Sequence, residues 1–368
     1  MAARHYENLI SSDSHIREPT DLWSKALSRK FGERTPRVVK NPNGLRGDFF
    51  YNGIGLTKIG EVEQEFARHF PDLGNAAFDP VARVAFQKKA NIAAEVLNPT
   101  QMSNIMPGKD VEMIRAAAQV LNDFMIDFVA QDRRRLIGNG VVPMHDVDWA
   151  IKEAERVRKA GLAGLLINIM APEGCPPYRD RSYDRFWAAA SDLGIPLTLH
   201  IITGRVLDPI LYAVTDEGRA EAPANLLDLF REVEIPIAND FVFGGILDRF
   251  EKLDLVCGEF ELAWLPNFIW RMDQIQDDFA PLLNVKKIKH RPADYVVGRI
   301  YHGLISDPHY LEIIGKYGVE HIVWGTDFPH IRSIGLDAQD QAKARFNTLP
   351  LADQEKLVGG TVARLYQH

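Results

Sequence analysis

Acidic and imidazole side chains stand at the ends of several short apolar runs of the sequence. Asp13 and His15 end the stretch ENLISSDSH, His200 ends GIPLTLH, Glu259 ends LDLVCGE, and Asp327 ends EHIVWGTD. Residues two apart on an extended segment point to the same side, so Asp13 and His15 can bind one common ligand. Carboxylates and imidazoles together bind divalent metal ions, and a catalytic centre keeps one coordination position open. The sequence therefore predicts a metal centre held by Asp13, His15, His200 and Asp327.

The same side chains are the candidates for catalysis, and we expect Asp327, Glu259 and His200 to take part in it. Asp327 lies in the apolar segment IVWGTDFPH, where an unpaired buried charge would be costly. Taken singly the signals are weak, because a D-x-H tripeptide occurs by chance and a lone histidine is more often a hydrogen-bonded core residue. Their convergence on the ends of predicted strands favours one common site.

Six further polar side chains near these positions are candidates for substrate binding. Arg17 and Glu18 follow the first motif, and they either bind a substrate carboxylate, support a ligand or lie at the surface. Two asparagines close their strands and can hydrogen-bond substrate, although asparagine also ends strands for turn reasons. An arginine beyond His200 offers a fork for a carboxylate. The predicted set is Arg17, Glu18, Asn98, Asn168, Arg205 and His330.

Eight short apolar or β-branched runs alternate with stretches of helical period, which are clearest over residues 110–132, 146–161, 181–194 and 307–318. Strand then helix, repeated about eight times, favours a parallel (β/α)8 TIM barrel, in which catalytic side chains project from the carboxyl ends of the strands. An open doubly wound sheet is the alternative, but no glycine-rich phosphate turn follows the first strand. The eight predicted strands are ENLISSD, NIAAEVLNP, RLIGNGVVPM, GLAGLLINIM, GIPLTLH, LDLVCGE, GRIYHGL and EHIVWGTD.

Residues of the types that begin and end helices flank the predicted helices. Asp110 and Asp307 are predicted as N-caps, and Gly161, Gly194 and Gly318 as the glycines that stop their helices. These signals place helix boundaries where the helical period begins and ends.

Two stretches do not fit the repeat and are predicted to be insertions after strands one and five. They cover about residues 23–79 and 204–224. Long insertions after barrel strands lie over the active-site face and shape substrate access, whereas the alternative is a surface excursion or a subunit contact. We expect residues 1–368 to form a single domain, because barrels of this size fold as one unit.

The composition is that of an ordinary globular protein with a sizeable core. Of the 368 residues, 46% are hydrophobic and 25% charged, and the formal net charge is −7. Scattered basic residues argue against nucleic-acid binding, so we expect a small-molecule substrate. No apolar run has the length of a membrane span or of a secretory signal core. Two lone cysteines, Cys175 and Cys257, fit a reduced, cytoplasmic protein.

Four blocks of the sequence together resemble the amidohydrolase-2 branch of the amidohydrolase superfamily, which includes aminocarboxymuconate-semialdehyde decarboxylase and several aromatic-acid decarboxylases. The blocks are DSHIREPTDLW, LTLH, GGILDRFEKLDLVCGEFELAWLPNFIWRMD and IVWGTDFPH. The resemblance runs from about Ile10 to the C-terminus and is weakest in the two insertions. It implies one metal ion bound by an acidic-or-His, x, His motif, a later His and a late Asp. Those positions correspond here to Asp13, His15, His200 and Asp327. Members of the family commonly form dimers, which implies a homo-oligomer.

The sequence departs from its better-known relatives at two positions. Asp13 stands where the decarboxylase that names the group has His and the aromatic-acid decarboxylases have Glu. Glu259 stands where the well-studied decarboxylases have a His that handles substrate or protons. Zn²⁺ is our first expectation for the metal, and the second carboxylate makes Mn²⁺ or Mg²⁺ competitive.

Three functions are consistent with these residues. The first is decarboxylation of a small carboxylated aromatic or conjugated compound, an expectation by analogy with the family. The second is metal-dependent hydrolysis or hydration of an amide, lactone, ester or carbon–carbon bond in the same fold. The third is a catalytically silent barrel used for binding or assembly, and the ligand-competent residue at every metal position counts against it.

Overall fold

Eight parallel strands, paired in chain order, form the centre of the molecule. The computed structural model describes residues 4–58, 75–204, 229–284, 287–330 and 333–368. Every predicted strand is present, and the observed strands are β1 (Leu9–His15), β5 (Ile92–Asn98), β6 (Leu136–Val141), β7 (Gly164–Ile167), β8 (Leu197–His200), β9 (Leu255–Gly258), β10 (Ile300–Leu304) and β11 (Ile322–Trp324).

The first and last strands meet and close the sheet into a barrel. Ser14 and Phe328 form a parallel bridge, and the His15 N–H donates to the Phe328 carbonyl at 2.6 Å. The Asp327 N–H donates to the Asp13 carbonyl at 2.8 Å just beside it. We call this junction between the end of β1 and residues 326–328 the seam. The predicted TIM barrel is confirmed, and the open doubly wound sheet is excluded.

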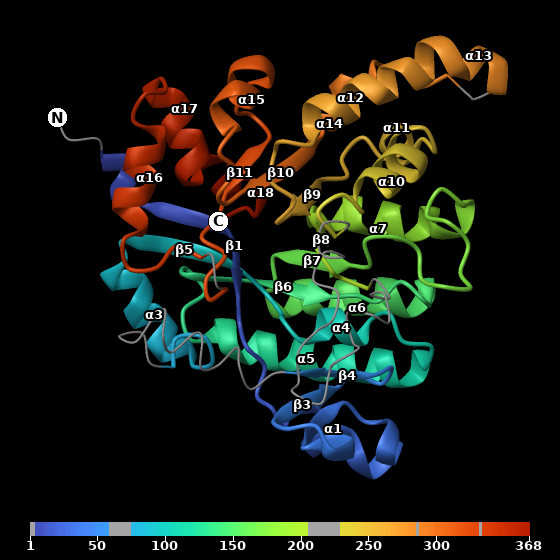
Figure 1. Cartoon of the computed structure of the whole chain (residues 1–368), viewed down its shortest axis with the longest axis vertical. Coiled ribbons are helices and arrows are strands. Elements are labelled where there is room, and N and C mark those ends of the chain that lie inside the picture. The colour runs from blue at the N-terminus through green and yellow to red at the C-terminus, as the bar shows by residue number, and fades with distance from the viewer. Residues whose placement is uncertain (1–3, 59–74, 205–228, 285–286, 331–332) are drawn as a thin grey trace.

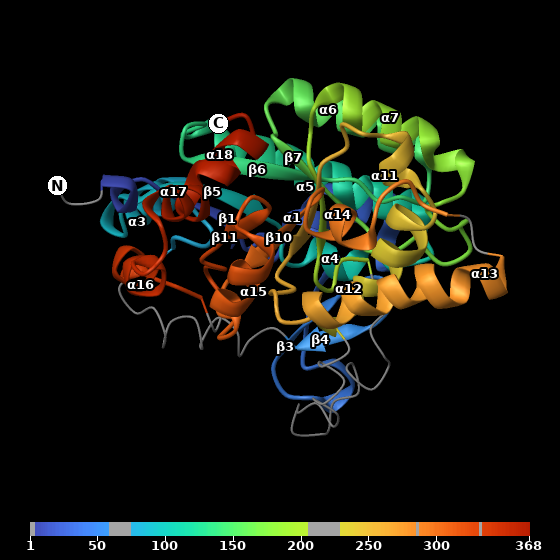
Figure 2. The same ribbon diagram turned by 90° about the horizontal axis from the view of Figure 1, so that it is seen from above.

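Helices cover the outside of the barrel between successive strands (Figure 1). Seen from above, α6 and α7 lie side by side along the outer wall, where they contact each other (Figure 2). No helix in the described ranges is long and apolar enough to cross a bilayer. The main helices are α3 (Pro80–Lys89), α5 (Val111–Ala130), α6 (Val147–Ala160), α7 (Asp184–Leu193), α11 (Ile246–Arg249), α12 (Leu265–Gln274), α13 (Ala280–Leu283), α14 (Pro292–Val296), α15 (Tyr310–Tyr317), α16 (Ala338–Phe346), α17 (Leu351–Glu355) and α18 (Thr361–Leu365).

Most of the predicted helix ends are confirmed. The Asp110 carboxylate accepts a hydrogen bond from the Met113 N–H at the start of α5. Gly161, Gly194 and Gly318 end α6, α7 and α15 with positive φ angles of 101°, 56° and 81°. Glycine adopts this backbone region without the steric penalty that a Cβ atom brings.

The predicted N-cap at Asp307 is wrong. Helix α15 begins at Tyr310, and its N-cap residue is His309. Asp307 instead accepts hydrogen bonds from the Leu262 and Ala263 N–H groups across the adjacent loop and from His309 N–H. Asp307 does precede the helix, as the sequence indicates, but most of its hydrogen-bond donors lie on the loop that follows β9.

The described residues of the insertion after strand one include a small substructure on one side of the barrel, whereas residues 59–74 of this insertion lie outside the described residues. The substructure contains α1 (Leu22–Phe31) and an antiparallel sheet of β2 (Arg37–Lys40), β3 (Asp48–Tyr51) and β4 (Leu56–Lys58). Trp23 is buried against α5, where its indole N–H donates to the Ala117 carbonyl at 3.0 Å. Of the second predicted insertion, residues 205–224 lie outside the described residues, and so does Arg205.

The C-terminal helix α18 closes the amino-terminal end of the barrel. Val362, Leu365 and the following Tyr366 pack in one cluster with side chains of β5, β6, β9, β10 and β11. The opposite, carboxyl end of the strands is therefore the end at which polar side chains can reach a ligand.

Candidate metal centre

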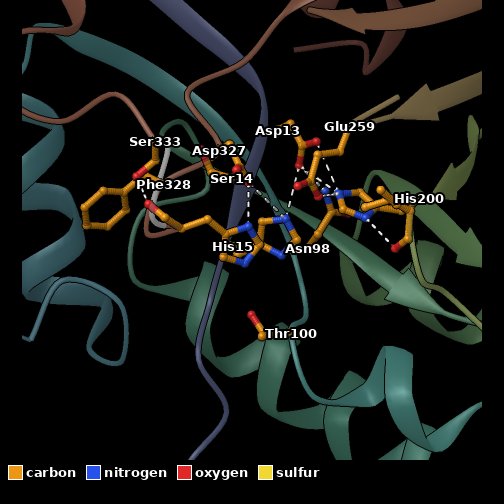
Figure 3. Close-up of polar contacts among 12 residues, drawn as sticks. Asp13, Ser14, His15, Asn98, Thr100, His200, Glu259, Asp327, Phe328 and Ser333 are labelled. Carbon is orange, nitrogen blue, oxygen red and sulfur yellow. Dashed lines mark hydrogen bonds and ion pairs between the residues drawn. The ribbon is translucent and has the colours of Figure 1, made fainter. Parts of the chain in front are cut away.

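The four predicted ligands come together at the carboxyl ends of β1, β8 and β11 (Figure 3). Asp13, His15, His200 and Asp327 are each less than 5% exposed. Asp13 and His15 both face the barrel interior, because they are two positions apart on one strand, while Ser14 faces the outside. The site thus assembles from residues at opposite ends of the chain.

His15 presents an unpaired ring nitrogen to two carboxylates. Its Nδ1 lies 3.2 Å from the Pro99 carbonyl, which fixes the proton on that nitrogen. Nε2 lies 3.5 Å from Asp13 Oδ1 and 3.6 Å from Asp327 Oδ1, and it makes no hydrogen bond. A lone pair that faces carboxylate oxygens in a buried site is unfavourable unless a cation lies between them.

His200 repeats this arrangement from the other side. Its Nδ1 lies 3.2 Å from the Ile201 carbonyl, and its Nε2 lies 3.2 Å from Asp13 Oδ2 and 3.7 Å from Glu259 Oε2. A histidine that binds a metal commonly donates its other ring N–H to a carbonyl, which fixes the ring and its tautomer. Both imidazoles therefore have the orientation that a metal ligand needs.

The charges of the site also call for a cation. Burial opposes the charged form of His200, yet the Asp13 carboxylate raises its pKa to about 10. Burial, followed by repulsion from Asp13, raises the pKa of Asp327 well above its usual value. Burial and the neighbouring Asp327 raise the pKa of Glu259 to about 8. Each shift favours the addition of positive charge, and a divalent metal ion supplies that charge with the hard oxygen and imidazole donors present.

His330, predicted as a substrate-binding residue, lies directly at this centre. Its ring packs on that of His15 with centroids 4.1 Å apart. Its Nδ1 lies 2.7 Å from Asp327 Oδ1, although the two atoms are not aligned for a hydrogen bond. Asp327 itself has the left-handed φ of 54°, which turns its side chain into the site.

The potential ligand atoms fall into two overlapping sets. Asp13, His15 and His200 form one, and His15, Glu259, Asp327 and His330 form the other, with the ligand atoms of each set within 4.8 Å of one another. Glu259 and His330 are thus within reach of an ion held by the four predicted ligands. These imidazole and carboxylate donors therefore fit a divalent metal ion.

A cavity of about 630 Å³ opens beside the centre, and its lining includes four acidic residues, Glu259, Glu261, Asp307 and Asp327. Its apolar walls include Phe260 and Trp264 from the loop after β9. The Glu259 side chain is 23% exposed and has a φ of 65°. A small, flat molecule can therefore reach Glu259 and Asp327 through an aromatic-lined opening.

Asn98 contacts a predicted ligand instead of the cavity. Its Nδ2 donates to Asp13 Oδ1 at 2.9 Å, and its Oδ1 accepts from Asn139 Nδ2 at 2.7 Å. A carboxylate only accepts hydrogen bonds, so the contact fixes which way the Asn98 amide faces. In this structure Asn98 orients Asp13, and its predicted contact with substrate remains a prediction.

The remaining predicted substrate residues lie around the site in different roles. Glu18 is buried and accepts hydrogen bonds from the Thr100, Gln101 and Met102 N–H groups, so it holds the loop after β5. Asn168 is buried and accepts from the Met144 N–H at 3.0 Å. The buried Arg17 is close enough for its charge to lower the pKa of His330, after the larger effect of burial.

Sequence reasoning missed a buried ion pair behind the seam. Arg83 on α3 and Glu95 on β5 are both fully buried, with Nε and Oε2 2.6 Å apart. The signal was present in the strand run NIAAEVLNP, where a single acidic residue stands among apolar ones and must find a partner if it is buried.

The fold and the site define a (β/α)8 barrel with candidate metal ligands at the ends of its first, fifth and eighth barrel strands. A family model described as amidohydrolase matches residues 67–367, and the chain belongs to this family. A curated relative, gamma-resorcylate decarboxylase of Polaromonas sp. (strain JS666 / ATCC BAA-500), is 25% identical over 260 residues, which cover 68% of this chain and 76% of the relative.

Solved structures share the fold over nearly the whole chain. An amidohydrolase from Mycobacterium avium subsp. paratuberculosis K-10 has a TM-score of 0.78 at 19% identity and covers 98% of this chain and 97% of its own. A 5-carboxyvanillate decarboxylase from Novosphingobium aromaticivorans DSM 12444, complexed with manganese and 4-hydroxy-3-methoxy-5-nitrobenzoic acid, has a TM-score of 0.72 at 16% identity, with 100% and 98% covered. A dihydroxybenzoic acid decarboxylase from Polaromonas sp. JS666, with manganese and 2-nitroresorcinol, has a TM-score of 0.66 at 19% identity, with 98% and 97% covered.

Proposed function

We propose that this chain is a divalent-metal-dependent decarboxylase of a small aromatic carboxylic acid. The observation that carries the proposal is that Asp327 and Glu259 line one cavity together with Phe260 and Trp264, beside the unpaired Nε2 of His15. The relationship to gamma-resorcylate decarboxylase, and to solved decarboxylases with bound nitroaromatic compounds, supports the same substrate class.

We propose Mn²⁺ as the metal ion, in place of the Zn²⁺ that the sequence first suggested. Two solved neighbours contain manganese, and the donor set of this site includes Asp13 and Asp327. Carboxylate oxygens favour Mn²⁺ and Mg²⁺ more than a set of imidazoles and thiolates does. Asp13, His15, His200 and Asp327 would hold the ion.

When bound, the metal supplies Lewis-acid chemistry, since it neutralises charge on substrate oxygens. We assign Asp327 as the group that gives a proton to the ring carbon bearing the carboxylate, because its side chain lines the cavity beside the proposed metal position. The bond between that carbon and the carboxylate then breaks, its electron pair restores the aromatic ring, and carbon dioxide leaves. Glu259, which shares the cavity with Asp327, is the second proton-transfer group and returns a proton to it from solvent.

The aromatic walls have a separate task in this scheme. Phe260 and Trp264 offer flat faces against which a ring can pack, which limits the orientations of the substrate. A fixed ring places the carbon to be protonated near Asp327 and excludes water from the reacting face. The binding energy of the substrate ring against these walls thereby orients the substrate for proton transfer.

Measurement of carbon dioxide release tests the proposal. Mn²⁺-loaded protein would be supplied with a panel of hydroxybenzoates and muconate semialdehydes, and in parallel with esters, lactones and amides. Release of carbon dioxide from one or more aromatic acids is expected, with the decarboxylated ring as the other product. Cleavage of the esters, lactones or amides without carbon dioxide release would contradict the proposal.

A hydrolase or hydratase is the second candidate, and the acidic residue at position 259 favours it. In that reaction Asp327 would take a proton from water, and Glu259, 3.7 Å from His200 Nε2, would orient that water. The same substrate panel separates the two reactions. Metal content well below stoichiometric in protein purified without chelator would instead support a silent barrel.

Our remaining proposals concern the setting of the enzyme. A single domain over residues 1–368, a homo-oligomeric assembly and a cytoplasmic location remain predictions. Gel filtration with light scattering tests the assembly, and limited proteolysis tests the single domain.

A further inference from the structure

Behind the seam lies a buried polar cluster that none of the proposed chemistry uses. Arg83 projects from α3, and Glu95 projects from the outer face of β5 toward it; both side chains are fully buried. Gln87, one turn after Arg83, donates from Nε2 to Glu95 Oε2 at 2.8 Å. The cluster therefore lies between the barrel wall and α3, on the side of the wall away from the metal centre.

Every N–H group of the Arg83 guanidinium has an acceptor. Nε donates to Glu95 Oε2 at 2.6 Å, and Nη2 donates to Glu95 Oε1 at 3.2 Å and to the Phe328 carbonyl at 3.5 Å. Nη1 donates to the carbonyls of His15 at 2.9 Å and Ala76 at 3.4 Å. The five donors of one rigid fork thus join α3, β5 and both sides of the seam.

Two of these acceptors are the backbone carbonyls of the seam itself. One belongs to His15, a predicted metal ligand, and the other to Phe328, the residue after the ligand Asp327. The Phe328 carbonyl also accepts the His15 N–H at 2.6 Å, and the Arg83 guanidinium lies 4.6 Å from the Phe328 ring centroid. A shift of the guanidinium would therefore displace the backbone beside both ligands.

The Glu95 carboxylate extends the cluster to two hydroxyl side chains that are next to predicted ligands in the sequence. Ser14, which lies between Asp13 and His15, donates from Oγ to Glu95 Oε1 at 2.9 Å. The same Oγ lies 2.9 Å from the Oγ1 of Thr326, the residue before Asp327. We call Arg83, Glu95, Ser14 and Thr326 the seam clamp.

We propose that Arg83 and Glu95 are positioning residues, which hold the ends of β1 and β11 in the one register that brings Asp13, His15 and Asp327 onto a common metal ion. The inference rests on the metal centre proposed above. Stability alone does not account for the pair, because well-packed apolar residues in place of a buried ion pair often preserve or raise stability. What apolar residues cannot provide is directional anchoring of the two carbonyls and of the two hydroxyls between the ligands.

Substitutions of Arg83 and Glu95 can distinguish a positioning role from a purely structural one, because the two roles predict different effects on metal binding. A structural pair, when replaced by apolar residues that restore packing, would leave metal binding as it was. A positioning pair would leave the fold intact and loosen the ligands, and loss of a group that orients metal ligands typically weakens binding about 10- to 100-fold. For a positioning pair, the substitutions should therefore weaken metal binding without an equal loss of thermal stability.

The decisive variant is the double substitution Arg83→Met with Glu95→Leu, which removes both charges together. Binding of Mn²⁺ alone would be measured on metal-free protein by the electron paramagnetic resonance signal of free Mn²⁺, and stability by thermal unfolding without metal. We expect a melting temperature close to that of the wild type and Mn²⁺ binding weakened at least about tenfold. Unchanged affinity in the folded double variant would overturn the proposal.

A conservative variant covers the case in which the double variant fails to fold. Arg83→Lys keeps the positive charge opposite Glu95, but one ammonium group cannot reach two carbonyls and two carboxylate oxygens in the geometry of the fork. We expect it to fold and to bind Mn²⁺ more weakly than the wild type. Wild-type affinity in this variant would likewise overturn the proposal.

A control comes from a partly buried ion pair on α6. Glu153 and Arg156 on α6 lie 2.7 Å apart, and Asn122 donates to the buried Glu153 carboxylate. Glu153→Leu with Arg156→Met should leave Mn²⁺ affinity unchanged, and an equal loss there would show that the effect is general destabilisation. Failure of the wild type itself to bind Mn²⁺ would contradict the proposed metal centre. This outcome is distinct from failure of the clamp proposal, in which the wild type binds Mn²⁺ and the clamp variants bind it equally well.

Discussion

The seam and the opposite wall of the barrel hold their polar side chains in different ways. At the seam, the backbone on both sides is fixed by Arg83, and Asp13 is also oriented by Asn98. On the opposite wall, at the ends of β8 and β9, His200 contacts a single carbonyl, and the Glu259 side chain is 23% exposed at the edge of the cavity.

This difference separates two requirements of a metal enzyme. An ion needs ligands that do not move, whereas proton transfer needs a group that reaches substrate and exchanges with solvent. The seam holds three of the four candidate ligands, and the wall near Glu259 offers the group that can exchange protons with solvent. We therefore expect substitutions at the seam to change metal binding, and substitutions at Glu259 to change turnover and its pH dependence.

The largest effect is expected where the two regions meet in the metal centre. His200→Ala and Asp327→Asn should each lower turnover by at least about a hundredfold, because each removes a metal ligand or the proton donor. Circular dichroism and thermal unfolding should show that the fold survives. Near-normal turnover in either variant would remove that residue from the site.

Glu259→Gln tests the opposite wall with the shape of the side chain preserved. If Glu259 transfers protons, the variant retains metal and binds substrate, but it loses most of its turnover and one limb of the pH–rate profile. Metal analysis and steady-state kinetics across pH provide the measurement. A decrease in proportion to lost thermal stability, with an unchanged pH profile, would make Glu259 structural.

Asn98→Ala tests the orientation of Asp13 at the seam. Removal of the amide leaves Asp13 Oδ1 without its 2.9 Å donor, so Mn²⁺ binding should weaken about tenfold. Asn122→Ala is the control, because Asn122 is an equally buried amide that bonds the Val141 backbone and Glu153. Equal Mn²⁺ affinity in both variants would show that Asn98 has no specific role.

Asp13→His exchanges an oxygen donor for a nitrogen donor at the seam. The variant should still bind a divalent ion, but the most effective metal should shift from Mn²⁺ toward Zn²⁺, because imidazole is the softer ligand. Turnover of metal-free protein reconstituted with each ion measures the preference. An unchanged order of metals would indicate that Asp13 supports the site without binding the ion.

The smallest expected effect is a dependence of stability on pH in metal-free protein. The pKa of Glu259 is raised to about 8 from 4.5, so the folded state binds its proton more tightly than the unfolded state does. Stability relative to Glu259→Gln should thus fall as the pH rises from about 5 to 8 and then level off. Added Mn²⁺ should reduce this difference, since a nearby cation lowers the pKa of a carboxyl group. Thermal unfolding of both proteins across pH measures it, and parallel curves without metal would contradict the shift.

The strands and the residues at their carboxyl ends were predictable because they depend on local pattern. An apolar run that ends in a polar residue, such as the one before His200, indicates both a buried strand and the residue at its end. Once a parallel barrel is inferred, all such ends lie on one face, so the convergence of Asp13, His15, His200 and Asp327 follows.

The contacts that support the ligands were not predictable, because they depend on which surfaces pack together. Asn98 was correctly placed at a strand end, but its partner Asp13 lies on a neighbouring strand and 85 positions away. Arg83 reaches Phe328 across 245 positions, and no local pattern reports that contact. The N-cap prediction for Asp307 was wrong for the same reason, since its carboxylate accepts a hydrogen bond from a loop 45 positions away.

The seam also decides when the site can form during synthesis of the chain. Ser11 and Thr326, whose hydroxyls lie 3.2 Å apart there, are separated by 315 positions, and the helix that closes the other end of the barrel comes later still. A ribosome releases the N-terminal ligands Asp13 and His15 long before Asp327 exists. Formation of the complete set of candidate ligands therefore requires nearly the whole barrel, and a nascent chain stalled before Thr326 should carry Asp13, His15 and His200 but not Asp327.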